Sequence, residues 1–281
     1  MMTKFDRWFF NLKWPFPFIV VVAFMVCFAV VTYKKKYLTK SGAFAAFVTG
    51  VVVLWCVHIQ GFILLLFFFA SSNFLGKYRL SKQKKNDIDI GEKKGSTRDY
   101  MQVLANGLMA VIAAISYYNT EYAGALVMFG SSIAEATSDT WAGEIGRLSV
   151  KPPVSIRTFR IVPKGISGGV TPLGFLGAFL GSFAVALLYL LFFRTGYRFI
   201  SFTIVTLTGF AGCLVDSFLG ATFQAIYIDE KNALTEKDVS PDGKKRKLVR
   251  GIAWLDNDMV NLASNVFSAF FAIALSKLLF V

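Results

Sequence analysis

The stretch PLGFLGAFLGSFAVALLYLLFF, residues 172–193, carries no charged side chain. A helix needs about 20 consecutive apolar residues to cross the hydrocarbon core of a bilayer, so this run is long enough to span one. Comparable runs predict helices over 15–33, 41–57, 60–76, 100–118, 121–138, 168–193, 199–225 and 258–280. We therefore expect an all-α, polytopic transmembrane helix bundle of about eight spans, forming a single transmembrane domain over residues 1–281.

The composition of the whole chain agrees with this fold class. Of the 281 residues, 55% are apolar and 17% are charged, and the mean hydropathy is +0.56. Soluble domains carry about 45–50% apolar and roughly 25% charged residues. An ordinary soluble domain is therefore excluded.

The distribution of charge predicts the orientation in the membrane. Of the 30 Lys and Arg, 24 lie in the connection 34–40 and in three long polar loops at about 77–99, 139–167 and 226–257. Positive connections stay in the cytoplasm, so these loops are predicted to be cytoplasmic and both termini external. The net charge of +13 is spread between apolar runs, so we expect membrane lipids as partners and no nucleic acid. The expected location is a bacterial-type cytoplasmic membrane.

Three acidic residues that lie within or directly beside predicted helices are candidates for a functional site. Glu135 and Asp139 lie four apart in SSIAEATSDTWAGEIG (131–146), on one helical face near its end, and Asp216 lies in CLVDSFLGATFQ (213–224). A charged residue inside a membrane helix costs about 2.5–3.5 kcal/mol and so marks a functional site. Carboxylate oxygens suit Mg²⁺, so we predict all three as catalytic residues and metal ligands. Interhelical salt bridges to Lys or Arg are the alternative for the first pair.

Polar residues also open the last predicted helix, in WLDNDMVNLASN (254–265). Asp256 and Asp258 are further candidate metal ligands, and Asn257 and Asn261 are candidate phosphate contacts. One of these residues can instead cap the helix, because Asp and Asn accept hydrogen bonds from the first-turn N–H groups.

A glycine-rich turn, KGISGGVT at 164–171, precedes the helix of the opening stretch. Glycines let backbone N–H groups turn towards an anion, and a helix N-terminus adds positive potential. The candidate phosphate-binding residues are Lys164, Gly165, Ser167, Gly168, Gly169 and Thr171. A re-entrant turn or a helix break would also use glycines.

Two further sets of polar residues complete the candidates. Arg98, Gln102 and Asn106 recur every four residues, and Gln224 follows Asp216 at the same period. Arg98 could instead be an anchor at the membrane interface. By the predicted topology, every set lies at the cytoplasmic end of a helix. Carboxylates, amides, cations and a glycine turn together suit phosphoryl transfer near a lipid surface.

These motifs resemble those of the DUF92 membrane proteins, a family that includes the plastid phytyl-phosphate kinase of vitamin E synthesis. The matching runs are Arg98-x3-Gln102-x3-Asn106-Gly107, Ser138-Asp139-Thr140-Trp141-Ala142-x-Glu144-Ile145-Gly146, Gly165-x-Ser167-Gly168-Gly169-Val170-Thr171, Asp216-Ser217-x2-Gly220-Ala221-Thr222-x-Gln224 and Asp256-Asn257-x2-Val260-Asn261. Ile166 stands where the family has a threonine. The resemblance implies transfer of a phosphoryl group from a nucleoside triphosphate, CTP being favoured, to a prenyl monophosphate, giving the diphosphate.

Two other functions fit the same residues. A transporter or flippase of a lipid phosphate would line a path with them, but it would also need polar residues in the external half of the helices, and few are present. A cytidylyltransferase that makes a CDP-lipid would use the same metal and nucleotide and release pyrophosphate.

Overall fold

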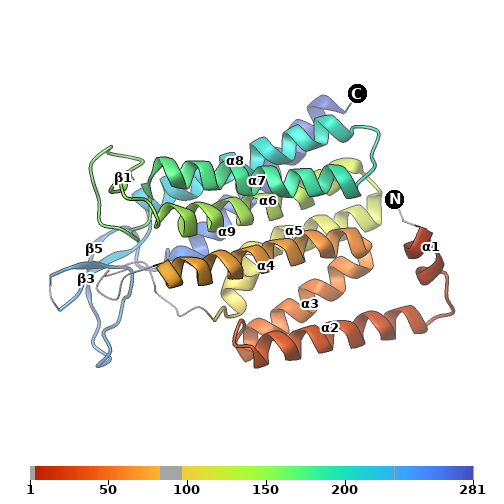
Figure 1. Cartoon of the computed structure of the whole chain (residues 1–281), viewed down its shortest axis with the longest axis horizontal. Coiled ribbons are helices and arrows are strands. Elements are labelled where there is room, and N and C mark those ends of the chain that lie inside the picture. Colours follow the sequence, from red (N-terminus) through yellow and green to blue (C-terminus); the bar gives the residue numbers. More distant parts are fainter. Residues whose placement is uncertain (1–3, 83–96, 231, 281) are drawn as a thin grey trace.

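The computed structural model describes residues 4–82, 97–230 and 232–280. This part of the chain forms nine helices, of which eight are long and run side by side (Figure 1). Their bounds are α1 Lys4–Phe10, α2 Phe16–Lys34, α3 Lys40–Cys56, α4 His58–Lys82, α5 Tyr100–Thr120, α6 Ala123–Gly146, α7 Pro172–Phe192, α8 Arg198–Thr222 and α9 Asn257–Leu279.

Five short strands lie in the polar connections. β1 (Val154–Ser155) pairs antiparallel with β2 (Gly169–Val170) between α6 and α7. Between α8 and α9, β3 (Ile226–Ile228) pairs antiparallel with β4 (Leu234–Thr235) and with β5 (Lys247–Arg250). The two long connections that the sequence analysis expects to be only polar loops are therefore partly ordered as small sheets.

The prediction of a polytopic helical bundle is confirmed. Six helices of the described chain are long and apolar enough to cross a membrane: α2, α4, α5, α7, α8 and α9. Helix α3 is apolar but shorter. Helix α6 carries serines and three acidic residues and is enclosed by other helices, since every residue from Gly124 to Ser138 is buried.

The bundle has one polar end. Both small sheets lie at the same end of the bundle, and the N- and C-termini lie at the opposite end (Figure 1). An even number of long helices, α2 to α9, brings the chain back to the end at which it starts, so both termini lie at the same end. The assignment of the polar end to the cytoplasm stays a prediction from the count of Lys and Arg.

Helices α4 and α6 continue well beyond their predicted ends. Helix α4 extends to Lys82 rather than residue 76, and α6 extends to Gly146 rather than residue 138. They continue together because their polar ends contact each other. Arg79 of α4 donates to Glu144 of α6 at 2.7 Å, and the Trp141 indole of α6 donates to Ser71 of α4 at 3.1 Å. Residues 139–146 are therefore helix, and Asp139 lies two turns before its end rather than at the end.

Helix α6 packs against α4, α5, α7, α8 and α9. Its most extensive contact is with α7, where Gly177 and Gly181 face its backbone. A Cβ atom would lie 2.9 Å from the Trp141 carbonyl oxygen at Gly177, and 3.0 Å from that of Thr137 at Gly181. Small residues at such positions let membrane helices pack closely, which positions the carboxylates of α6 at the centre of the bundle.

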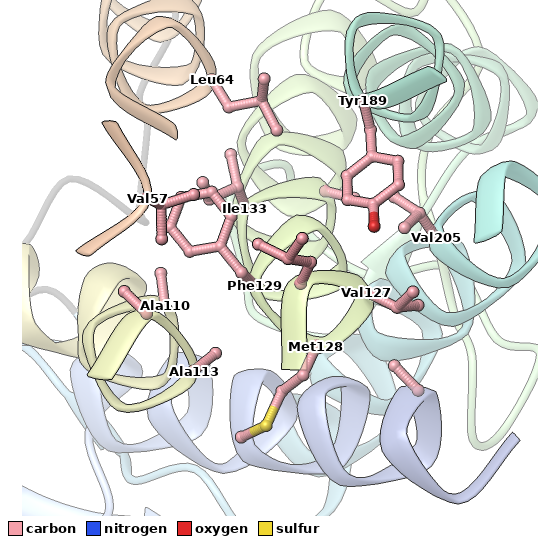
Figure 2. Close-up of a cluster of buried hydrophobic side chains, with 14 of the residues drawn as sticks. Val57, Leu64, Ala110, Ala113, Val127, Met128, Phe129, Ile133, Tyr189 and Val205 are labelled. Atoms are coloured by element: carbon pink, nitrogen blue, oxygen red, sulfur yellow. The ribbon is translucent and has the colours of Figure 1, made fainter. Parts of the chain in front are cut away.

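An apolar cluster fills the bundle between the acidic residues and the end that holds the termini. Figure 2 shows it around Phe129 and Ile133 of α6, with labelled side chains from neighbouring helices that include Val57, Leu64, Ala110, Ala113, Tyr189 and Val205. The ten residues from Phe129 to Asp139 correspond to about 15 Å of helix. The polar site described below therefore rests on a tightly packed apolar core.

Candidate active site

A cavity of about 570 Å³ opens at the polar end of the bundle. Fourteen of the seventeen residues that the sequence analysis selects line it. These are Arg98, Gln102, Asn106, Asp139, Lys164, Gly165, Ser167, Gly168, Gly169, Thr171, Asp216, Asn257, Asp258 and Asn261. They come from α5 and the residues just before it, from α6, α8 and α9, and from the segment that leads from Lys164 to the start of α7. Residues up to 163 positions apart in the chain therefore meet in one place.

Two carboxyl groups face each other in this cavity. Asp139 of α6 and Asp216 of α8 both line it and are close enough to interact electrostatically. The Asn261 amide, oriented so that both of its polar atoms are satisfied, donates to Asp216 Oδ2 at 3.0 Å and to the Asn257 carbonyl at 3.1 Å. Two ionised carboxylates so close repel each other, so the pair requires a proton or a cation.

Glu135 lies behind this pair and does not line the cavity. Its carboxylate accepts hydrogen bonds from the Asn265 amide at 2.5 Å and from Ser264 Oγ at 2.8 Å. The same Ser264 hydroxyl lies 3.1 Å from Asp216 Oδ2. A hydroxyl has one proton, so Ser264 serves one carboxylate at a time and links the buried Glu135 to the cavity.

Asp256 and Gln224 also lie outside the cavity lining. Asp256 is the N-cap of α9, where Oδ1 accepts from the Met259 N–H at 3.1 Å. Gln224, two residues after the end of α8, is buried at 1% exposure. The motif predicts one cap at α9, and the structure assigns that cap to Asp256. Asp258, two positions on, is the acidic residue of this motif that faces the cavity.

The glycine turn takes the shape of a cradle. Gly165 and Gly168 have φ of +86° and +79°, which L-residues with a side chain rarely adopt. The turn leads through β2 into Thr171, the N-cap of α7, whose hydroxyl accepts from the Gly174 N–H at 3.0 Å. Lys164 reaches back and donates to the Ser149 carbonyl at 2.8 Å. Thr171 and Lys164 therefore each have a structural contact as well as a place at the cavity.

The acidic residue that meets this cradle is one that sequence reasoning missed. Glu236, next to β4, accepts from the Ser167 N–H at 3.0 Å and from Ser167 Oγ at 2.6 Å. Its side chain is 4% exposed. The Glu236 carboxylate thus accepts from the Ser167 N–H and hydroxyl groups, which are hydrogen-bond donors that a phosphate oxygen could also use. The sequence gives no local signal for this contact, because the two residues are 69 positions apart.

The stripe on α5 borders the cavity on another side. Asp99 caps α5 in a capping box, in which the Asp99 N–H donates to Gln102 Oε1 at 3.1 Å. The Asn106 amide donates to the Gln102 carbonyl at 2.8 Å. The Arg98 guanidinium lies over the Phe68 ring, 5.5 Å from its centre. Loss of hydration lowers the pKa of Arg98, but a guanidinium stays charged at neutral pH.

Further cations that were not selected from the sequence also line the cavity: Lys35, Lys36, Lys77, Arg79 and Arg147. They stand at helix ends, where the sequence pattern attributes positive charge to membrane orientation. Lys77 donates to the Tyr37 hydroxyl at 2.7 Å, and this hydrogen bond lowers the pKa of Tyr37. With Arg98 and Lys164, seven Lys and Arg of the described chain surround the cavity. The cavity is therefore suited to a ligand with several negative charges.

The donor set also fits a magnesium ion. In the described residues, no group of three or more His, Cys, Asp or Glu is arranged to hold a metal by itself. Mg²⁺ usually keeps several waters and binds through one or two carboxylates together with substrate phosphates. The facing carboxyl groups of Asp139 and Asp216, with Asp258 on the same cavity, match that pattern.

Comparisons with known proteins agree with the resemblance seen in the motifs. Protein PGR of Arabidopsis thaliana is 30% identical over 276 residues, which cover 90% of this chain and 93% of that protein. An uncharacterized membrane protein of Methanocaldococcus jannaschii is 34% identical over 207 residues, covering 73% and 82%. Protein VTE6, chloroplastic, of Arabidopsis thaliana is 25% identical over 250 residues, covering 85% and 66%. No solved structure matches the chain.

Residues 23–269 match the family described as integral membrane protein DUF92. This range contains every residue of the cavity lining, helices α3 to α8 in full and parts of α2 and α9. The protein is therefore an integral membrane protein of the DUF92 family.

Proposed function

We propose that this protein is a membrane-embedded kinase that transfers a phosphoryl group from a nucleoside triphosphate to a prenyl monophosphate, giving the diphosphate. The observation that carries the proposal is a single cavity that combines facing carboxyl groups, a glycine cradle and seven cations. Catalysis of phosphoryl transfer depends mostly on positioning and on compensating the charge of the phosphates, and these groups suit both tasks. The family resemblance supports the acceptor and favours CTP as the donor.

Each group has a role in this reaction. The cradle Gly165–Gly169, with Lys164, would bind the phosphates of the donor through backbone N–H groups. Arg98 and the cations at the ends of α2 and α4 would bind the acceptor phosphate. An oxygen of the acceptor phosphate would attack the terminal phosphorus of the nucleoside triphosphate. The bond from that phosphorus to the leaving nucleoside diphosphate would break, and the acceptor would become a prenyl diphosphate. The attacking oxygen is already ionised, so a general base is not required.

Asp139 and Asp216 would hold Mg²⁺, and Asp258, Asn257 and Asn261 would orient its waters or the substrate oxygens. When bound, the ion supplies positive charge against the phosphate oxygens. Ser264 and Glu135 hold Asp216 and the ends of α6, α8 and α9 in place.

The packing below the cavity favours an enzyme over a transporter. The apolar cluster around Phe129 and Tyr189 fills the half of the bundle that a translocated phosphate would have to cross. A charged group in such surroundings costs several kcal/mol unless it is paired. Because the polar end carries most of the Lys and Arg, we place the reaction at the cytoplasmic face of the membrane.

The test is an assay of purified protein with radiolabelled CTP or ATP, Mg²⁺ and prenyl monophosphates. We expect a prenyl diphosphate as product, and we expect turnover to disappear when the metal is chelated. Asp139→Asn and Asp216→Asn should each abolish turnover in protein that still unfolds at the wild-type temperature. Release of pyrophosphate with formation of a CDP-lipid would instead identify a cytidylyltransferase. Full activity of both variants would contradict the proposal.

A further inference from the structure

A second, smaller pocket of about 90 Å³ adjoins the cavity. It lies between α2, α3, α4 and α5, and its wall is formed mainly by apolar side chains such as Met25, Phe28, Phe62 and Leu65. Four residues line both spaces: Phe68, Arg98, Gln102 and Asn106. The apolar pocket therefore begins where the cation-lined cavity ends.

We propose that this pocket binds the part of the acceptor's hydrocarbon chain next to the phosphate, and that Gly107 determines how much chain it admits. The proposal rests on the proposed function, because it assumes a lipid monophosphate as the acceptor. A phosphate near Arg98 on the cavity side would have its first carbons directed to the other side of the same residue. A ligand with a charged head and an apolar chain fits this arrangement, in which the cation-lined cavity is followed by the apolar pocket.

The size of the pocket limits how many carbons it can hold. An apolar cavity of about 150 Å³ accommodates a benzene ring. A pocket of about 90 Å³ therefore holds roughly a five-carbon segment and not a whole lipid chain. The remaining chain has a way out, because Leu66 lines the pocket and is 39% exposed on the outer surface of α4. It would continue from there into the bilayer.

Gly107 controls the free space from the α5 side. A Cβ atom at this position would meet a single neighbouring atom, Thr49 Cγ2, at 3.7 Å, which is an ordinary contact. A larger side chain at Gly107 therefore projects into the pocket without displacing the backbone. Gly50, on the opposite wall, differs because a Cβ atom there would collide with Met25. Gly107 is accordingly the position at which the pocket can be filled with little disturbance of the fold.

The test measures binding without turnover. Monophosphates whose apolar part grows from one to five carbons are bound to purified wild-type, Gly107→Ala and Gly107→Val proteins in detergent. The wild type should bind about fourfold more tightly for each added carbon, which is the value for burying one methylene group. In Gly107→Val this gain should be absent, and the affinity for a ten-carbon prenyl monophosphate should fall at least about tenfold. Gly107→Ala should lie between them.

Two controls separate this inference from the proposed function. Cys27→Leu adds bulk on the exposed side of α2 and should leave lipid binding unchanged. Binding of inorganic pyrophosphate should be the same in all variants, because that ligand has no chain. Wild-type lipid affinity in a folded Gly107→Val protein would overturn the inference, whatever the assay of turnover gives. If no nucleotide supports turnover, the proposed kinase fails while the chain-length measurement still tests the pocket.

Discussion

Glu236 accepts two hydrogen bonds from Ser167, one from the backbone N–H at 3.0 Å and one from Oγ at 2.6 Å. The carboxylate comes from the connection between α8 and α9, and the donors come from the glycine cradle before α7. A phosphate oxygen bound in the cradle would need the same N–H group. Glu236 therefore competes with an anionic ligand for the cradle, by its charge and by its position.

Replacing Glu236 with Ala should strengthen the binding of pyrophosphate or nucleotide. Hydrogen bonds to charged groups contribute about 1.5–3 kcal/mol, so freeing these donors corresponds to at least about a tenfold gain in affinity. Calorimetry on the purified protein measures it. Asp238→Ala removes an exposed acidic residue of the same connection and is the control for net charge alone. Weaker binding by Glu236→Ala would mean that Glu236 helps to hold the ligand.

A second prediction separates the roles of the acidic residues. Glu135→Gln should keep turnover within about tenfold of the wild type, because glutamine can still pair with Asn265 and Ser264. Asp216→Asn should lose about a hundredfold or more, the usual effect of removing a group that acts on the developing charge. Measurements of the turnover rate and of its dependence on Mg²⁺ concentration distinguish the Glu135→Gln variant from the Asp216→Asn variant. If folded Glu135→Gln were as inactive as Asp216→Asn, Glu135 would belong to the reacting centre.

Much of the site could be predicted because polar residues are rare in membrane helices. Asp139 and Asp216 stand out in apolar surroundings, and the positive-inside rule places the ends of their helices at one face. The ends of α4 and α6 could not be predicted in the same way. Their last turns depend on the contact between Arg79 and Glu144, which are 65 positions apart in the chain.

Cations and acidic residues in connections were harder to interpret. Lys77 and Arg79 match the ordinary signal for membrane orientation, and only the structure turns them towards the cavity. Glu236 lies among other charged residues of a polar loop, and it reaches the cradle because β3, β4 and β5 fold the connection back over the bundle. Sequence spacing reports neighbours on one helix, whereas these contacts join separate segments.

The third prediction concerns the close contact between the cradle and α8. Gly168 has φ of +79°, and a Cβ atom there would lie 2.5 Å from the Ala221 Cα and backbone N atoms. Gly168→Ala should therefore displace the cradle from α8 and abolish anion binding. Gly243→Ala is the matched control, because Gly243 has φ of +85° with no atom within 4 Å of the added Cβ. The control carries only the backbone cost of about 1–2 kcal/mol. The two variants are compared by their thermal unfolding and by their affinity for pyrophosphate. If Gly243→Ala lowered both as much as Gly168→Ala does, the contact of Gly168 with α8 would have no specific role.

The last prediction concerns the ion pair that joins the extended ends of α4 and α6. Arg79 and Glu144 are 2.7 Å apart, with side-chain exposures of 5% and 22%. Breaking a buried pair by removing one partner costs about 3–5 kcal/mol, and the partial exposure of Glu144 places Arg79→Ala at the lower end. The free energy of unfolding in mixed micelles should therefore fall by about 3 kcal/mol. Because Arg79 also lines the cavity, the affinity for pyrophosphate should fall as well.

Two comparisons make this result interpretable. Lys244→Ala breaks the ion pair with Asp242. The two side chains of that pair are 83% and 57% exposed, so the free energy of unfolding should hardly change. In the double variant Arg79→Ala with Glu144→Ala, part of the lost stability should return, because no carboxylate remains without its partner. If the double variant were less stable by the sum of the two single losses, the pair would have no coupling energy. The joint extension of α4 and α6 would then have to come from the packing of Trp141 against α4.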